Sequence, residues 1–350
     1  MNTKCARKMP ALLPVLRKTL ALLLVLMIFQ LLSLSGCRKA GGVAGPAGST
    51  GSTGSTGDSV SADRLEFGIM PDVDSIPVII AQSQGYFEKE GAKVSLQLFR
   101  SAMDRDSALQ SGQMDGVISD ALAAAFAVQG GMDVRITSQT NGSYKLLAGK
   151  DTDIPAIQDL AGRSIGISKN TIIEYVTDRM TAEAGTDPAG LNKIIIKDIP
   201  ARLEMLQQGK IDAATLPEPL ASVAIGNGAR ILGSSDQLGV NPGIMLFKAS
   251  SVTGKANAIA AFYRAYDRAV DYLRKTPLTD FSGILIAEAS FPENIAKTMV
   301  LPEYTHASPL PDHTLAQVHS WLLERELITA DTDLKKLLSI RDDRFLGKQQ

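Results

Sequence analysis

Acidic, hydroxyl and amide side chains gather at the ends of several predicted strands, where they could hydrogen-bond a small molecule. They are Asp72, Asp74 and Ser75 after residues 65–70, Ser119 and Asp120 at the end of 116–119, Asn141 and Tyr144 after 134–140, Ser168, Asn170 and Thr171 at the end of 164–168, and Glu218 after 213–216. Several of these segments open predicted helices, whose first backbone N–H groups have no partner within the helix. Carboxylates, hydroxyls and free N–H groups together offer acceptors and donors. We therefore predict that these residues form a ligand-binding site.

Most of these residues also have a local structural explanation, which the sequence leaves open. Four of them precede predicted helices and could simply cap the first N–H groups: Ser75, Asp120, Asn170 and Thr171. Glu218 lies between two prolines and could instead stabilise the dipole of the helix that follows. Tyr144 is an aromatic candidate for stacking on a planar ligand.

The predicted site loops carry more negative than positive charge. Their acidic residues are Asp72, Asp74, Asp120, Glu174, Asp198 and Glu218, and their basic residues are Lys145, Lys169 and Arg202. A site for a simple anion favours a bidentate arginine, and Arg202 is the single candidate in these loops. The surplus of carboxylates therefore favours a neutral or cationic ligand, such as a heterocycle or an amine.

The sequence offers little for catalysis or for a cofactor. The three histidines, His306, His313 and His319, lie in the C-terminal region, away from the predicted site. Metalloprotease, serine-hydrolase and phosphate-loop motifs are absent from the sequence. We predict no catalytic residue, no metal and no cofactor, although Asp72 and Asp120 could in principle act as an acid and a base. An enzyme or a sensor input built on the same fold is the alternative.

Short apolar strands alternate with helical patterns as far as residue 247, and the pattern is purely helical afterwards. This alternation predicts βαβ units and hence an α/β fold with mostly parallel sheets. Two strand-rich blocks predict two lobes, each a doubly wound sheet. We assign residues 63–148 and 245–350 to lobe one, with the C-terminal helices as its extension, and residues 149–244 to lobe two. Ligands of such sheets bind beyond the carboxyl ends of the strands, where the candidate residues stand.

The N-terminal segment predicts export and a membrane anchor. Residues 1–36 combine five positive charges, the apolar run 20–32 and the small residues Ser35 and Gly36. This arrangement is typical of a signal peptide, and the segment ending at Cys37 resembles a bacterial lipobox. We predict cleavage before Cys37, lipidation of its thiol and an extracytoplasmic position at the cell membrane, with an uncleaved anchor as the alternative. Residues 37–62, rich in Gly, Ser and Thr, predict a flexible tether.

Four segments pair a glycine turn with the start of a strand. They are residues 84–91, 107–116, 159–168 and 205–214. In this order and spacing they resemble the periplasmic substrate-binding proteins of ABC importers, in particular the group for nitrate, sulfonates, taurine and thiamine precursors. The resemblance covers residues 64–340. It implies a type II periplasmic binding protein fold, which closes over a small solute and delivers it to a permease with its ATPase.

Charge and cysteine content limit the other partners. Without the positive charges of residues 1–36, acidic residues outnumber basic ones, so we predict no nucleic-acid partner. Cys37 is the last of two cysteines, so the folded part has no disulfide and no cysteine-based metal site. We expect a monomer.

Overall fold

The computed structural model describes residues 64–347 of the chain. The predictions for the signal peptide 1–36, the lipidated Cys37 and the tether 37–62 lie outside the described residues. The described residues 64–347 belong to one compact unit. Every helix between residues 64 and 347 is too short or too polar to cross a bilayer.

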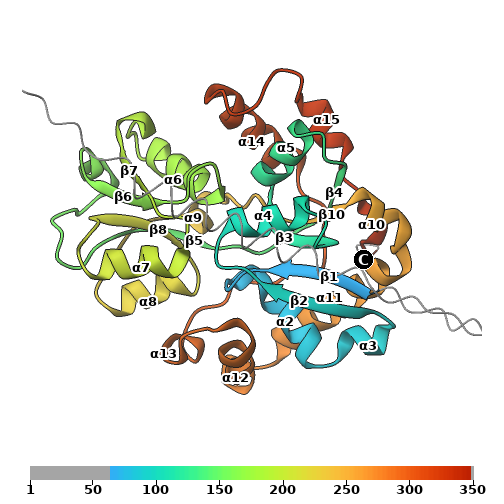
Figure 1. The fold of residues 1–350 in the computed structure, drawn as a ribbon. Coiled ribbons are helices and arrows are strands. Elements are labelled where there is room, and N and C mark those ends of the chain that lie inside the picture. The colour runs from blue at the N-terminus through green and yellow to red at the C-terminus, as the bar shows by residue number, and fades with distance from the viewer. Residues whose placement is uncertain (1–63, 348–350) are drawn as a thin grey trace, which may run out of the picture. The chain divides into compact units, whose positions relative to one another are not determined.

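The first sheet has five strands in the order β2-β1-β3-β10-β4 (Figure 1). These strands are β1 (Arg64–Ile69), β2 (Lys93–Leu98), β3 (Gly116–Asp120), β4 (Val134–Gln139) and β10 (Gly243–Lys248). β1 pairs in parallel with β2 and β3, whereas β10 runs antiparallel to β3 and β4. Four strands therefore share one direction, as the sequence predicts.

The second sheet repeats this arrangement, with the order β7-β6-β8-β5-β9. Its strands are β5 (Tyr144–Ala148), β6 (Ser164–Ile167), β7 (Asn192–Ile195), β8 (Ala213–Pro217) and β9 (Arg230–Ser234). β6 pairs in parallel with β7 and β8, and β5 runs antiparallel to β8 and β9. The predicted α/β class with two mostly parallel sheets is confirmed.

The chain passes between the sheets twice, through residues 140–143 and 235–242. The lobe boundaries predicted after residues 148 and 244 need correction. Strand Tyr144–Ala148 pairs within the second sheet, and β10 of the first sheet already begins at Gly243. The prediction placed these boundaries wrongly because the residues of a short apolar strand do not indicate which sheet the strand joins.

Helices connect the strands and follow them. Those of the first lobe are α2 (Ile76–Ser83), α3 (Tyr86–Glu90), α4 (Ala102–Gln110) and α5 (Ala121–Gln129). Those of the second lobe are α6 (Ile172–Glu183), α7 (Ile199–Gln207), α8 (Leu220–Gly226) and α9 (Ser235–Leu238). The C-terminal helices are α10 (Ala249–Gly254), α11 (Ala256–Lys275), α12 (Leu278–Ala289), α13 (Glu293–Ala296), α14 (Asp312–Glu324) and α15 (Leu334–Ser339).

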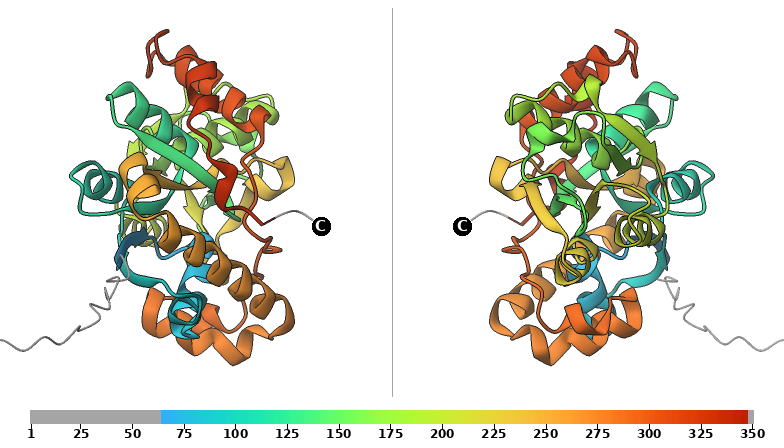
Figure 2. Two further views of the ribbon diagram at one scale, coloured as in Figure 1. Left: turned by 90° about the vertical axis from the view of Figure 1, so that its right-hand side faces the viewer. Right: turned by 90° about the vertical axis from the view of Figure 1, so that its left-hand side faces the viewer.

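An aromatic cluster fixes the long helix α11 to the first sheet. The ring of Phe262 on α11 lies 4.7 Å from that of Phe67 on β1 and 5.2 Å from that of Phe87 on α3, between centroids. Phe247 on β10 completes the cluster. Figure 2 shows α11 and α12 beside α2 of the first lobe, with which both helices pack. The C-terminal helical extension of lobe one is therefore confirmed.

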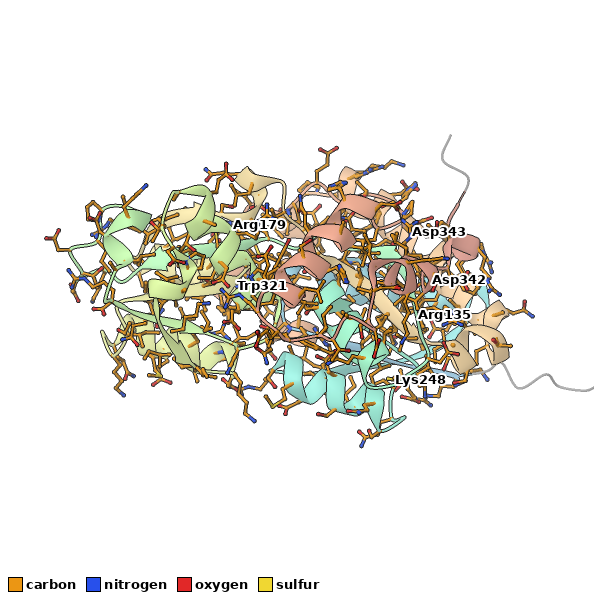
Figure 3. All side chains as sticks on the ribbon, turned by 90° about the horizontal axis from the view of Figure 1, so that it is seen from above. Arg135, Arg179, Lys248, Trp321, Asp342 and Asp343 are labelled. Carbon is orange, nitrogen blue, oxygen red and sulfur yellow. The ribbon has the colours of Figure 1, made fainter. Side chains whose placement is uncertain are left out.

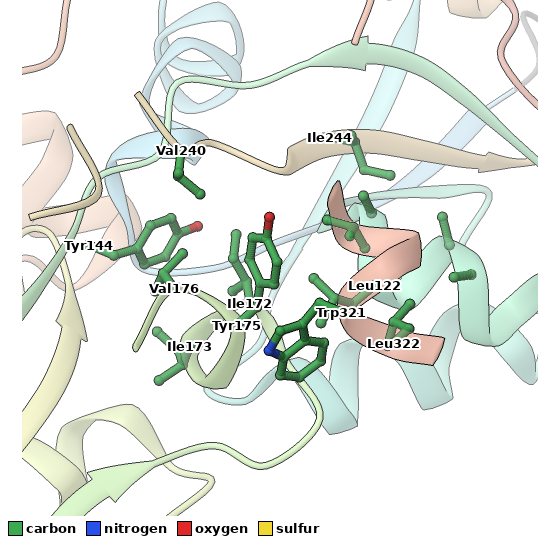
Figure 4. Close-up of a cluster of buried hydrophobic side chains, with 14 of the residues drawn as sticks. Leu122, Tyr144, Ile172, Ile173, Tyr175, Val176, Val240, Ile244, Trp321 and Leu322 are labelled. Carbon is green, nitrogen blue, oxygen red and sulfur yellow. The ribbon is translucent and has the colours of Figure 1, made fainter. Parts of the chain in front are cut away.

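Helix α14 contacts both lobes. It packs on α5 of the first lobe, and its Trp321 meets α6 of the second lobe (Figures 3 and 4). The Trp321 ring lies edge-on to that of Tyr175, with 5.6 Å between centroids, and its Nε1 donates to Asp178 Oδ2 at 3.1 Å. Arg325 stacks on the indole and pairs with the Asp178 carboxylate. One apolar core therefore runs from α5 through α14 to α6.

Replacing Trp321 should destabilise the protein strongly. Trp321→Ala removes a buried ring and leaves Asp178 without one of its donors, so the free energy of unfolding should fall by about 3–5 kcal/mol. Urea unfolding followed by circular dichroism measures the change. Leu323→Ala is the control, because Leu323 on the same helix is 37% exposed and its loss should change stability far less. Equal effects of both substitutions would contradict this account of the core.

Candidate functional site

A buried cavity lies where strand ends of both sheets meet. The cavity has a volume of about 30 Å³, which leaves room for about two water molecules. Its apolar walls are Met70, Ile118, Ile172, Ile173, Ile199 and Pro217. A solute of more than a few atoms therefore needs the walls to move apart.

Seven of the residues predicted from the sequence line this cavity, and they come from both lobes. They are Asp72, Asp74, Ser119, Asp120, Tyr144, Ser168 and Thr171. The remaining four, Ser75, Asn141, Asn170 and Glu218, do not line it. Tertiary structure thus separates the candidates by position, and their binding role stays a prediction.

The turn after β1 carries two buried carboxylates. Asp72 caps the short turn Val73–Ser75 by accepting from Ser75 N at 3.3 Å. The Ser75 hydroxyl donates to Asp72 Oδ1 at 3.1 Å and accepts from Met70 N at 3.2 Å, so Ser75 positions Asp72 and does not cap α2. Asp74 Oδ2 accepts a hydrogen bond from the Tyr144 hydroxyl at 3.3 Å, which is a contact between the lobes.

At the end of β3, Asp120 caps a helix, which is one of the two roles that the sequence left open, and it also lines the cavity. Its Oδ1 accepts from Ala123 N at 2.9 Å and so caps α5. Its Oδ2 lies 3.5 Å from Nη2 of Arg105, across the cavity wall. Ser119, next to it, is also buried and lines the cavity. Asp120 is therefore both a helix cap and a charged wall of the site.

Arg105 is the cavity residue that the sequence interpretation missed. It lies on α4, which Ser101 caps, and it is 4% exposed. Its Nε donates to Asp106 Oδ1 at 2.8 Å. The sequence contained a signal for Arg105, because α4 follows the predicted strand 93–99. Ligands of α/β sheets bind beyond the carboxyl ends of the strands, and this applies to that strand as well.

In the second lobe, the loop after β6 presents Ser168 and Thr171. Thr171 caps α6, since its Oγ1 accepts from Ile173 N at 3.2 Å, and the same hydroxyl donates to Ser168 O at 2.9 Å. Asn170 has a left-handed backbone with φ of 57°, and its N–H donates to Glu174 Oε2 at 2.7 Å. The loop therefore offers the cavity two hydroxyl-bearing residues, and Asn170 shapes the turn.

Arg202, considered from the sequence as an anion ligand, has a structural role. Its guanidinium is fully buried and donates to Ile196 O, to Thr215 O and to the Ser168 hydroxyl. Burial lowers its pKa to about 10, so it stays charged at neutral pH. Because protein groups occupy its donors, Arg202 holds Ser168 in place and does not line the cavity.

Two other predicted residues also serve the lobe junction. Glu218 pairs with Lys145 and accepts from Ser222 N at 3.0 Å, which matches the helix-start role that the sequence left open. Asn141 bonds to Thr305, with Nδ2 to Oγ1 at 3.4 Å and Thr305 N to Oδ1 at 3.3 Å. Both contacts lie outside the cavity.

Burial makes Asp72 and Asp74, in the turn after β1, weaker acids than aspartates in water. Burial raises the pKa of Asp72 to about 6. Burial and the neighbouring charge of Asp72 raise the pKa of Asp74 to about 7. For Arg105, burial alone would lower the pKa, but the carboxylates of Asp106 and Asp120 raise it above its usual value. The cavity thus combines a permanent cation with carboxylates that exchange protons near neutral pH.

A metal-binding arrangement is not apparent in the part of the chain that the structure describes. Between residues 64 and 347, no group of three His, Cys, Asp or Glu side chains is placed to hold a metal ion. The cavity itself is lined by carboxylates, hydroxyls, one guanidinium and apolar groups. Such a lining can bind a solute through hydrogen bonds and charge.

Comparison with protein families identifies a match over more than half of the chain. The family model described as NMT1/THI5 like matches residues 72–279. A curated relative from Brachyspira hyodysenteriae, named as an ABC transporter periplasmic binding protein, is 24% identical over 235 residues. That alignment covers 63% of this chain and 68% of the relative.

Solved structures share the fold at low sequence identity. The alkanesulfonate-binding protein SsuA from Xanthomonas axonopodis pv. citri, bound to MOPS, has a TM-score of 0.69 and 17% identity, with 80% of this chain and 98% of that chain covered. The nitrate-binding protein NrtA from Synechocystis PCC 6803 has a TM-score of 0.68 and 14% identity, with coverage of 81% and 87%. The desulfurization enzyme DSZB has a TM-score of 0.58 and 16% identity, with coverage of 81% and 97%. The predicted periplasmic binding protein fold is confirmed.

The raised pKa values predict that stability falls as the pH rises. Both groups have a folded-state pKa above the ordinary 3.8, so the folded state holds protons that the unfolded state releases from about pH 4 up to about pH 6 for Asp72 and about pH 7 for Asp74. Each group then removes up to about 1.4 kcal/mol of stability per pH unit in that window. Asp74→Asn cannot ionise and should flatten this dependence, gaining stability relative to the wild type at pH 8.

Urea unfolding between pH 4 and pH 8 measures this effect. Asp331→Asn, at an exposed position, is the control and should follow the wild-type curve. If Asp74→Asn and the wild type also lost stability in parallel, Asp74 would not carry a raised pKa.

Proposed function

The chain belongs to the NMT1/THI5-like family, and we propose on that premise that it is the extracytoplasmic solute-binding component of an ABC importer. It would capture a small organic solute between its lobes and deliver it to a permease with its ATPase. The relative from Brachyspira hyodysenteriae supports this assignment through its name. The convergence of polar side chains from both lobes on one buried cavity is the observation that carries it.

The two passages of chain between the sheets supply a hinge for opening and closing. Only residues 140–143 and 235–242 connect the sheets along the backbone. Direct contacts between the lobes include polar ones across the cleft, in which Val73 N donates to Glu218 O at 3.2 Å and Arg100 Nε pairs with Asp198 Oδ2 at 3.1 Å, and the apolar packing of α14 on α6. Breaking such contacts opens the cavity, and a solute that bonds to both lobes would shift the population back toward the closed form.

We further propose that the protein is held at the membrane by a lipid on Cys37, with residues 37–62 as the tether. A tether of about 25 residues without secondary structure has a typical reach of about 25–30 Å. That reach lets the folded unit meet a membrane-bound permease while it stays outside the cytoplasm.

The charges at the cavity favour a neutral or cationic solute, such as a heterocycle or an amine, over a simple anion. Glu174, Asp198 and Glu218, which the sequence count included, do not line the cavity. Asp72, Asp74 and Asp120 do, and Arg105 is the cation among the lining residues. The three carboxylates outnumber the one cation, so the cavity residues also favour a neutral or cationic solute over a simple anion.

An enzyme remains the second candidate, because DSZB shares the fold. The residues that line this cavity include no histidine, cysteine or lysine, so a reaction would depend on Asp72, Asp74 or Asp120. Incubating the protein with a bound solute and measuring the solute's mass separates the two functions. A binder returns the solute unchanged.

Asp120→Asn should weaken solute binding without unfolding the protein. Asparagine still caps a helix, but it removes one charge from the cavity wall, so we expect about a tenfold or larger rise in Kd for a cationic solute. Residues 59–350, which lie in one compact unit, can be screened by thermal shift against pyrimidines, polyamines, sulfonates, nitrate and small carboxylates. A solute at 100 times its Kd should stabilise the wild type by about 2.7 kcal/mol.

The exposed Asp331→Asn again serves as the control and should bind like the wild type. Unchanged Kd values for Asp120→Asn would remove Asp120 from the site.

Cys37→Ser should release the protein from the membrane. Without the thiol no lipid can be attached, so the full-length protein should move from the detergent phase to the aqueous phase in Triton X-114 partitioning of expressing bacteria. Cys5→Ser, which changes the other cysteine, should leave partitioning unaltered. A detergent-phase Cys37→Ser protein would contradict lipid anchoring.

A further inference from the structure

Buried polar atoms without hydrogen-bond partners gather at the cavity. Within residues 64–347, such atoms include Asp74 Oδ1, Arg105 Nη2 and Ser119 Oγ, all on residues that line it. A buried polar atom that lacks a partner costs about 1–3 kcal/mol. Three of them around one cavity are groups to which a ligand could supply better hydrogen bonds.

Arg105 has one guanidinium nitrogen that is paired by charge but makes no hydrogen bond of good geometry. Its Nε bonds to Asp106, and its Nη1 points to the sulfur of Met70 at 3.7 Å. Nη2 lies 2.8 Å from Asp106 Oδ1 and 3.5 Å from Asp120 Oδ2, but neither contact has hydrogen-bond geometry. Since a guanidinium does not deprotonate in proteins, its free N–H groups need an acceptor.

Asp74 provides the complementary acceptor. Its Oδ2 receives the Tyr144 hydroxyl, whereas Oδ1 lies near the Thr140 hydroxyl without a hydrogen bond of good geometry, and the carboxylate is 3% exposed. The backbone passes very close to this group. A Cβ on Gly142 would lie 2.6 Å from Asp74 Oδ2, and a Cβ on Gly243 would lie 3.3 Å from Oδ1. The passage 140–143 and the start of β10 thus lie against the Asp74 carboxylate.

We propose that the cavity recognises a solute that carries a hydrogen-bond acceptor for Arg105 and an N–H donor for Asp74 on the same small molecule. This inference rests on the proposed function and narrows its ligand class. The solute is an amide, an amino-substituted heterocycle with a ring carbonyl, or a zwitterion.

Solutes with one kind of group satisfy only half of this site. A simple ammonium ion bonds to Asp74 but leaves Arg105 unpaired and adds a second positive charge. A simple anion pairs with Arg105 but meets the carboxylates of Asp72, Asp74 and Asp120. Sites built to bond a polar group can reject an analogue without it by about 10⁴-fold, so a preference of about 100-fold or more is expected here.

Isothermal titration calorimetry of residues 59–350 with a matched set of probes tests the proposal. Acetamide, cytosine and glycine carry both groups, methylammonium and guanidinium carry donors alone, and acetate and methanesulfonate carry acceptors alone. At least one probe with both groups should bind about 100-fold more tightly than any probe with one. Arg105→Gln should lose most of this preference by weakening that probe, and Asp74→Asn should do the same from the other side, whereas Arg163→Gln, at an exposed position, should retain it.

The outcomes separate this inference from the importer assignment. Binding of methylammonium or of acetate as tightly as the probes with both groups would overturn the paired recognition and leave a solute-binding protein. Conversion of a probe into a product would overturn the binding function. No binding by any probe would overturn the paired recognition, whereas the thermal-shift screen with its wider set of solutes decides the importer assignment. The wild-type comparison decides the question even where Arg105→Gln does not fold.

Discussion

The direction in which the chain enters each sheet determines most of this architecture. The carboxyl ends of the parallel strands face the cavity, and both passages between the lobes also reach the sheets at that end. A strand that begins there must run against its neighbours, as β5 does in the second sheet and β10 in the first. Tyr144, the first residue of β5, therefore lines the cavity, and Gly243, the first residue of β10, lies beside Asp74.

The chemistry of the cavity follows from the burial of several carboxyl groups together with one guanidinium group. Asp72 and Asp74 resist ionisation because burial removes water from them. Arg105 keeps its charge, since Asp106 and Asp120 stand beside it. A site of this kind is polar and yet incompletely paired. Its groups gain more from a solute that completes their hydrogen bonds than from one that only opposes their net charge.

Helix α6 connects this site to the C-terminal helices. Its first residues line the cavity, and one turn later Glu174 and Asp178 meet Lys193 at 3.0 and 2.7 Å. Asp178 also receives Trp321 and Arg325 of α14. Glu174 links the two ends of this network, because its other oxygen holds the backbone of Asn170 in the cavity loop. The wall of the cavity and the contacts with α14 therefore depend on the same helix.

The sequence by itself determined the α/β class, the helical C-terminal extension and the strand-end loops from which the site is built, because periodicity and capping residues are local properties. It also placed Asp72, Asp74, Ser119 and Asp120 at strand ends, and in the structure these residues line the cavity. Only tertiary structure decided which sheet receives Tyr144–Ala148 and that Arg202 faces inward. It also decided that Arg105 lies beside Asp120, although the sequence interpretation had not connected the helix of Arg105 with the site. These outcomes depend on pairing between segments far apart in the chain, and no local pattern of residues records which distant segment a strand or a buried charge will meet.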